Sequence, residues 1–178
     1  MGADTVVEAY VRGKDGNRPE VALRAFASDA RLTVRNATAA VAFPAVTEGR
    51  DAIVDVLVTQ FGRQYANVRT FCLARPPAGA TSFACDWLVG MTSRADASVR
   101  VGAGRYDWTF RASDGCASAL AIGIDAMTVL PPPLAPAILR WMQVLDYPWT
   151  TAVRIEDTAP GIEGLAPVLA RLRPGATR

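Results

Sequence analysis

The chain has 178 residues, 51% of them hydrophobic, and its 19 basic and 17 acidic side chains nearly cancel. This is enough apolar material for one domain with an appendage, and it excludes disorder throughout the chain. The arginines are scattered, so the basic stripe of a nucleic-acid-binding protein is absent. No run approaches the roughly 18 apolar residues of a membrane span, and residues 1–13 lack the pattern of a secretory signal. We expect a cytoplasmic protein without nucleic-acid or membrane partners.

The sequence contains no histidine. This excludes Ser-His-Asp and Cys-His arrangements, histidine metal ligands and an imidazole base near pH 7. Acid–base chemistry is left to carboxylates, tyrosines, cysteines and Lys14, the single lysine beside eighteen arginines. The three cysteines lie at no metal-like spacing, so we expect reduced thiols and no metal. The excess of arginine and alanine indicates a GC-rich bacterial genome.

Periodicity divides the first part of the chain into five elements. Gly13 and Gly16 end the first helix, and Pro19 opens the second. Pro44 cannot donate to a ladder, which confines its strand to an edge. The predicted elements are a helix over 4–13, a helix over 19–27, a strand over 29–36, a short edge strand over 40–46 and a long helix over 48–65.

After the long helix the pattern changes to long strands joined by short turns, which is typical of an antiparallel meander. The predicted strands cover 67–76, 81–94, 98–113 and 117–130. Helices before such a sheet predict an α+β domain. The glycine pair at 102–104 predicts a bulge. Residues 131–178 form a C-terminal helical extension too apolar to float free, so it packs over the sheet, over a pocket mouth or against a second subunit.

This order of elements, with "FASDARL" before the first strand and "EGRDAI" opening the long helix, resembles the nuclear transport factor 2-like superfamily, in its SnoaL-like and ketosteroid-isomerase-like branch. The resemblance covers residues 4–130 and implies a domain over 1–130. It implies a cone in which a curved antiparallel sheet wraps around the long helix, with a hydrophobic pocket inside the cone and a homodimer. The superfamily includes isomerases, dehydratases, polyketide cyclases and proteins without catalysis, so the fold alone does not settle activity.

The resemblance also assigns roles to single residues. In the ketosteroid isomerases, the oxyanion-binding tyrosine lies twenty residues before the alanine of a "DDA" element. Here Tyr10 lies twenty residues before Ala30, so it matches that tyrosine. Their second donor is a protonated acid eight residues before the glycine of the last hairpin turn. Here Asp107 lies eight residues before Gly115, so it matches that acid. The base of those isomerases falls on Val34, which cannot accept a proton. A copy of steroid isomerisation is therefore not expected, although a donor pair remains.

Another carboxylate could replace the missing base. The resemblance to SnoaL-like cyclases is consistent with such a replacement, because these enzymes use an acidic residue as base without metal or cofactor. Asp86 and Asp125 are the candidates, since both lie within apolar strands. The competing interpretation is structural ion pairing, because a buried carboxylate is costly without a partner. The candidate partners are Arg35, Arg105 and Arg111.

The strand "GRYDWTF" leaves two orientations open. If Tyr106, Trp108 and Phe110 face the cone, Asp107 lies on the outer face in a surface ion pair; a shift of one residue reverses this. Trp87 and Trp108 are packing residues or walls for a flat ligand. Val34, at the position of the family's base, is a further ligand-binding candidate.

Two functions follow from these patterns. The first is a cofactor-independent isomerase, cyclase or dehydratase, with Tyr10, Asp107 and Asp125 as catalytic residues and Asp86, Trp87, Trp108 and Val34 around the ligand. The second is a non-catalytic module that binds a small hydrophobic molecule or a protein partner.

Overall fold

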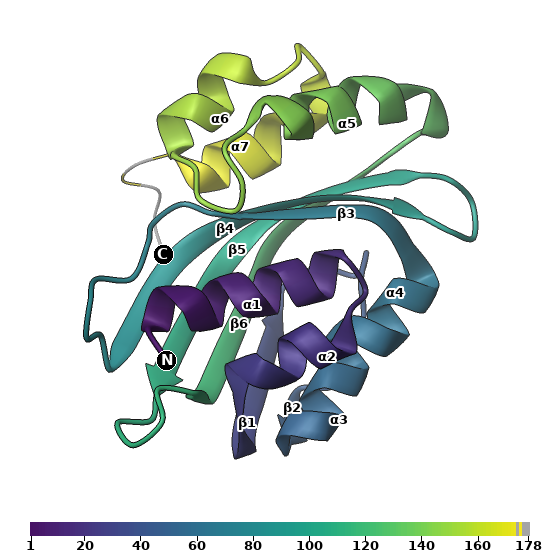
Figure 1. The fold of residues 1–178 in the computed structure, drawn as a ribbon. Helices are drawn as coiled ribbons and strands as arrows, with labels where there is room; N and C mark the ends of the chain where they lie inside the picture. Colours follow the sequence, from purple (N-terminus) through teal and green to yellow (C-terminus); the bar gives the residue numbers. More distant parts are fainter. Residues whose placement is uncertain (174, 176–178) are drawn as a thin grey trace.

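The computed structural model describes residues 1–173 and 175. It contains one six-stranded sheet in the order β2-β1-β6-β5-β4-β3, with helices against both faces (Figure 1). Helices α1–α4 lie on the inner face of the curved sheet, and α5–α7 lie over the outer face. This arrangement confirms the α+β cone that the sequence predicts. No helix in the described part of the chain is long and apolar enough to cross a membrane.

The first half of the chain builds the inner layer and one edge of the sheet. Its elements are α1 (Ala3–Asp15), α2 (Pro19–Ala22) with a 3₁₀ turn (Leu23–Ala25), β1 (Phe26–Asn36), β2 (Val46–Glu48), α3 (Arg50–Val54), a π-helical segment (Asp55–Gln60) and α4 (Phe61–Gln64). The last three form one continuous helical run, as predicted for residues 48–65. Its apolar face is buried as the spacing predicts, with Ile53, Leu57 and Val58 at most 2% exposed.

The four long strands confirm the predicted meander. They are β3 (Tyr65–Cys72), β4 (Ser82–Ser93), β5 (Val99–Phe110) and β6 (Ala117–Leu130). Each pairs antiparallel with the next. The sheet as a whole is mixed, because β1 pairs with β6 in parallel. That pairing brings the first strand beside the last one and places β2 at the edge.

Several predicted boundaries were wrong; the second helix, for example, ends at Ala25, and β1 begins at Phe26. The first helix does not end at Gly13 but continues to Asp15. Gly13 is needed for packing, since a Cβ there would lie 2.7 Å from the backbone nitrogen of Ala22. The short edge strand is β2 rather than 40–46, because residues 37–45 form a loop whose start is held by a hydrogen bond from the Asn36 amide to the Val41 carbonyl (2.7 Å).

The outer face of the sheet has an apolar half and a polar half. On β5, Val99, Val101 and Ala103 are fully buried beneath the extension, whereas Asp107 on the same face is exposed. The register between β5 and β6 shifts after Ala103, with Asp125 as the extra residue on β6, which confirms the predicted bulge. The sheet is therefore covered on two sides only along part of its length.

The extension covers the apolar half of the outer face. It consists of a 3₁₀ turn (Pro132–Leu134), α5 (Ala135–Val144), α6 (Ala152–Thr158), a second 3₁₀ turn (Glu163–Leu165) and α7 (Ala166–Leu172); helix α6 was not predicted. Its buried apolar residues form a second core with the sheet, separate from the core inside the cone. Residues 174 and 176–178 of the predicted extension lie outside the described residues.

Arg171 links α7 to the sheet through ion pairs. Its guanidinium donates to Asp125 (2.8 Å) and to Asp86 (3.0 Å), and Arg35 from β1 also donates to Asp125 (3.0 Å). The side chains of Arg171, Asp86 and Asp125 are 13%, 20% and 20% exposed, so this network is largely desolvated. The two acids are therefore balanced by Arg171 of the extension together with Arg35 of β1.

We predict that Arg171→Leu lowers the free energy of unfolding by about 2 kcal/mol, between the values typical of exposed and buried ion pairs. The reason is that Asp86 and Asp125 lose their main counter-ion while remaining largely buried. Arg173→Leu is the matched control, because Arg173 is 60% exposed and pairs with Glu156 at the surface; it should cost less than about 1 kcal/mol. Urea titrations of both variants measure the difference, and equal losses would contradict the role of Arg171.

Candidate functional site

A small cavity of about 50 Å³ lies inside the cone, between the inner face of the sheet and the N-terminal helices. Most of its wall is aliphatic or aromatic. The loop after β1 contributes Val41 and Phe43, and the helical run contributes Leu57 and Phe61. The other lining residues are Tyr10, Lys14, Val34, Thr70, Trp87, Val89, Met91, Tyr106, Ile122, Ile124 and Met127.

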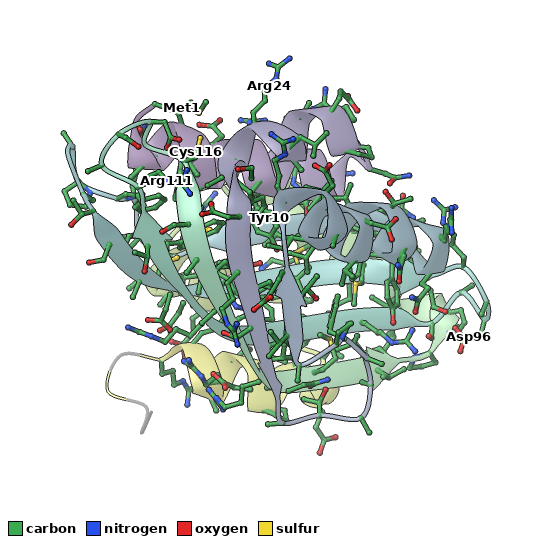
Figure 2. All side chains as sticks on the ribbon, turned by 90° about the horizontal axis from the view of Figure 1, so that it is seen from below. Met1, Tyr10, Arg24, Asp96, Arg111 and Cys116 are labelled. Atoms are coloured by element: carbon green, nitrogen blue, oxygen red, sulfur yellow. The ribbon has the colours of Figure 1, made fainter. Side chains whose placement is uncertain are left out.

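Tyr10 and Tyr106 bring two hydroxyl groups to this cavity from opposite layers. Tyr10 lies on α1 and Tyr106 on β5, and their rings meet edge to face with centroids 5.9 Å apart. Figure 2 shows Tyr10 in the interior of the fold, away from Asp96 in the β4–β5 turn. Burial raises the pKa of both hydroxyls well above their usual range. Both are therefore hydrogen-bond donors at ordinary pH.

Trp87 closes one wall and has an unused donor. Its ring stacks on Tyr106 with centroids 5.5 Å apart. It also packs on Gly104, where a Cβ would lie 2.6 Å from the indole ring and 1.9 Å from the Gly123 carbonyl oxygen, so only glycine fits. Trp87 is 3% exposed, and its indole nitrogen is buried without a partner among the described residues. An unmade buried hydrogen bond is costly, which marks this N–H as a group that a ligand could satisfy.

A buried ion pair lies at the same cavity. Lys14 follows Tyr10 by one turn of α1, so both side chains reach the same side of the helix. The ammonium of Lys14 donates to Asp15 (2.8 Å) and to the Thr70 hydroxyl (2.7 Å). It lies 5.2 Å from the centre of the Phe61 ring. The side chains of Lys14 and Asp15 are only 7% and 6% exposed.

Asp15 uses all of its acceptor capacity within the protein. One carboxylate oxygen accepts from Lys14 and from the Thr70 hydroxyl (2.8 Å). The other accepts from the Thr70 backbone N–H (2.6 Å) and the Tyr147 hydroxyl (3.1 Å). Four donors on two oxygens saturate a carboxylate. Asp15 is therefore a fixed counter-ion for Lys14.

Tyr147 brings the C-terminal extension into this network. Two guanidinium groups lie over its ring, that of Arg12 at 5.0 Å and that of Arg69 at 4.6 Å from the ring centre. The following residues pair with the edge strand β3, where Cys72 N–H donates to the Pro148 carbonyl (2.8 Å). Burial raises the pKa of the Tyr147 hydroxyl, and the adjacent Asp15 charge raises it further. Tyr147 therefore stays a donor to Asp15.

Three of the residues that the sequence proposed line the cavity. They are Tyr10, Val34 and Trp87. Trp108 is buried in the adjoining core, in edge contact with Tyr10 (centroids 5.3 Å apart), but it does not line the cavity. These three residues therefore lie at the cavity, and the roles proposed for them stay predictions.

The structure corrects the pocket placement of Asp107. Its side chain is 53% exposed on the outer face and forms an ion pair with the neighbouring Arg105 (3.1 Å). Tyr106 and Trp108 on either side of it are buried inside the cone, and alternation along β5 sends Asp107 the other way. The burial of the aromatic rings outweighs the exposure of one acid, so the outward orientation prevails.

The structure also places Asp86 and Asp125 away from the cavity, on the outer face of the sheet next to α7. Both bind Arg171, as described above. Of the three predicted arginine partners, Arg35 does bind Asp125, whereas Arg105 and Arg111 pair with other acids. Arg171 was not anticipated, because nothing in the sequence shows where α7 lies on the sheet.

The sequence named Lys14 as one of several possible acid–base groups, but it did not single out Asp15, Thr70, Tyr106 or Tyr147. One signal was available: the only lysine of the chain stands beside an acid at the end of an apolar-faced helix. Thr70 and Tyr147 lie 55 and 132 residues from Asp15. No local pattern reveals such pairs.

The cysteines and the acids form no further centre. Cys72 and Cys85 are buried free thiols, and a hydrogen bond with Cys85 together with burial raises the pKa of Cys72. A protonated buried thiol is a poor nucleophile. Within residues 1–173 and 175, no group of three or more cysteines and acids could hold a metal ion.

We predict strong coupling between Lys14 and Asp15. Lys14→Met and Asp15→Asn should each cost about 3 kcal/mol, because each leaves a buried charge unpaired, whereas the double variant should cost clearly less than the sum. The matched control is the exposed pair of Glu8 and Arg12 on the same helix, where coupling should stay below about 0.5 kcal/mol. Denaturant unfolding of both cycles gives the coupling energies, and equal values would refute a desolvated pair.

No family model matches this sequence, and no curated protein matches it. Similar solved structures exist. A hexachlorocyclohexane dehydrochlorinase (LinA type 2) has a TM-score of 0.59 at 14% identity, covering 70% of this chain and 84% of its own. A nuclear transport factor 2-like protein of Burkholderia thailandensis has 0.57 at 14% identity, covering 70% and 92%.

A computationally designed binder of 17-OHP has a TM-score of 0.56 at 13% identity, covering 72% of this chain and 99% of its own. Identities this low establish a shared fold and no shared activity. The chain has the nuclear transport factor 2-like fold, as its sequence resemblance implied.

Proposed function

We propose that the protein binds a small, mainly apolar molecule carrying an acceptor oxygen in the cavity of the cone. The observation that carries this proposal is the chemistry of the cavity wall. Apart from apolar side chains, it contains an ammonium, two phenols, an indole and a hydroxyl that already donates to Asp15. Among the residues that the structure describes, no carboxylate lines it. A ligand oxygen satisfies such groups, whereas a ligand cation would face the Lys14 ammonium.

The size of the cavity limits what can enter. About 50 Å³ holds only a few water-sized groups, far below the roughly 300 Å³ of a usual ligand pocket. Three flexible or loop-borne side chains form part of the wall, namely Phe43, Met91 and Met127. Methionine adapts its shape at low cost. We infer that a ligand of five or six heavy atoms enters by displacing these side chains.

Cyclopentanone tests this proposal. Titration followed by the Trp87 indole resonance in NMR spectra should give saturable binding. Val34→Phe should abolish it by filling the cavity, whereas Val129→Phe should leave it intact because Val129 is 49% exposed on β6. Equal binding to both variants would place the ligand elsewhere and contradict the proposal.

A second candidate function is catalysis next to a carbonyl group, as in the isomerase, cyclase or dehydratase predicted from the sequence. The observation that favours it is the pair of protonated hydroxyls, Tyr10 and Tyr106, at the same cavity. Such donors stabilise an enolate oxygen as it forms. Because the described part of the chain places no carboxylate on the wall, the base would come from the solution. Binding without turnover therefore remains the better-supported function.

Deuterium exchange separates these two functions. If the site promotes enolisation, an α C–H bond of cyclopentanone breaks, the proton passes to a buffer base, and the electron pair moves to the oxygen. Protein in D₂O should then speed α-deuteration. Tyr10→Phe should slow it at least tenfold through the lost donor, and Asp107→Asn should leave it unchanged. No acceleration by the native protein removes the catalytic candidate and leaves binding.

A homodimer, a bacterial source and a cytoplasmic location complete the proposal. The dimer is supported by the uncovered polar half of the outer face, which includes Arg105 and Asp107. The source and the location are inferred from composition.

A further inference from the structure

We propose that Lys14 binds and polarises the carbonyl oxygen of an uncharged ligand. This inference rests on the proposed ligand-binding function and deepens it by naming the polar group and the class of ligand. The argument depends on three properties of Lys14: an unused donor, a fixed position and a balanced charge.

Lys14 has one N–H group to spare. An ammonium carries three donors. Among the residues that the structure describes, Asp15 and the Thr70 hydroxyl accept from it. The third is left for the cavity, where Phe61 offers only its ring face. A ligand oxygen there would receive a charge-assisted hydrogen bond, the strongest kind in proteins.

The surroundings of Lys14 hold it in place. Thr70 is fully buried, accepts from Lys14 and donates to Asp15, which closes a ring of hydrogen bonds. Tyr147 adds a further donor to Asp15 from the extension. A donor fixed in advance does not have to reorganise when the ligand arrives. The extension thus takes part in positioning Lys14, although it covers the other face of the sheet.

The charge balance selects the class of ligand. Asp15 already neutralises Lys14 inside a nearly water-free site. A carboxylate ligand would bring a second, uncompensated negative charge, which is costly to desolvate. An amine ligand would be repelled by the ammonium. A ketone or aldehyde adds no net charge and accepts a hydrogen bond, so it fits the site best.

The test compares cyclopentanone with methylenecyclopentane, which has the same shape but no oxygen. Replacing Lys14 by Met should reduce the affinity for the ketone about tenfold or more, while the affinity for the hydrocarbon stays constant. The infrared carbonyl band of bound, ¹³C-labelled ketone should lie at lower wavenumber in the native protein than in the variant. The double variant Lys14→Met/Asp15→Asn also lacks the ammonium, but it leaves no buried charge unpaired. It is the second variant in which the same loss of ketone affinity is expected.

Val129→Phe is the control, since Val129 is 49% exposed on β6, does not line the cavity, and its replacement leaves the ammonium and its partners in place. Its carbonyl band should stay near the native position. An unchanged band in both Lys14 variants, with ketone still bound, would overturn the role of Lys14 and leave the proposed binding function standing. Tighter binding of cyclopentanecarboxylate than of cyclopentanone would overturn the ligand class. Absence of binding by both neutral probes would overturn the binding function as well.

Discussion

The sheet has to bury apolar side chains on both of its faces, and the rest of the structure depends on this constraint. The inner rows of β4, β5 and β6 pack on α1 and the helical run to form the first core. Their outer rows pack under α5 and α7 to form the second. Because burial of apolar area is the dominant stabilising effect, both faces need a helical cover. Once the rows are assigned, the direction of every polar residue between them is decided.

That assignment separates the acids of the strands from the cavity. Asp86, Asp107 and Asp125 all lie on the outer face, in ion pairs with arginines. Inside the cone the only ion pair at the cavity is that of Lys14 and Asp15, among the residues described in the structure. It persists there because five hydrogen bonds and a ring face compensate the loss of water around two charges. The site is thus rich in donors and poor in bases, which favours binding of an oxygen-bearing ligand over proton abstraction.

The extension has two roles that are usually separate. Through α5 and α7 it completes the burial of the sheet, and through Tyr147 it reaches around the edge strand β3 to Asp15. A change in the packing of the extension would therefore alter the position of the Lys14 ammonium. This coupling is short, because Tyr147, Asp15 and Lys14 form one chain of hydrogen bonds.

Sequence patterns by themselves determined most of the fold. Alternation and helical periodicity report which side chains must be buried, so the long strands, the helical run and the bulge near Gly104 were predicted correctly. The family resemblance pointed to Tyr10 and Val34, and the aromatic pattern to Trp87; all three line the cavity, and their roles there stay predictions. Tertiary structure alone decided the orientation of Asp107, the partner of Asp86 and Asp125, and the grouping of Asp15 with Thr70 and Tyr147. A period of two defines two rows but not which row faces inward, and hydrogen bonds between distant residues leave no local trace.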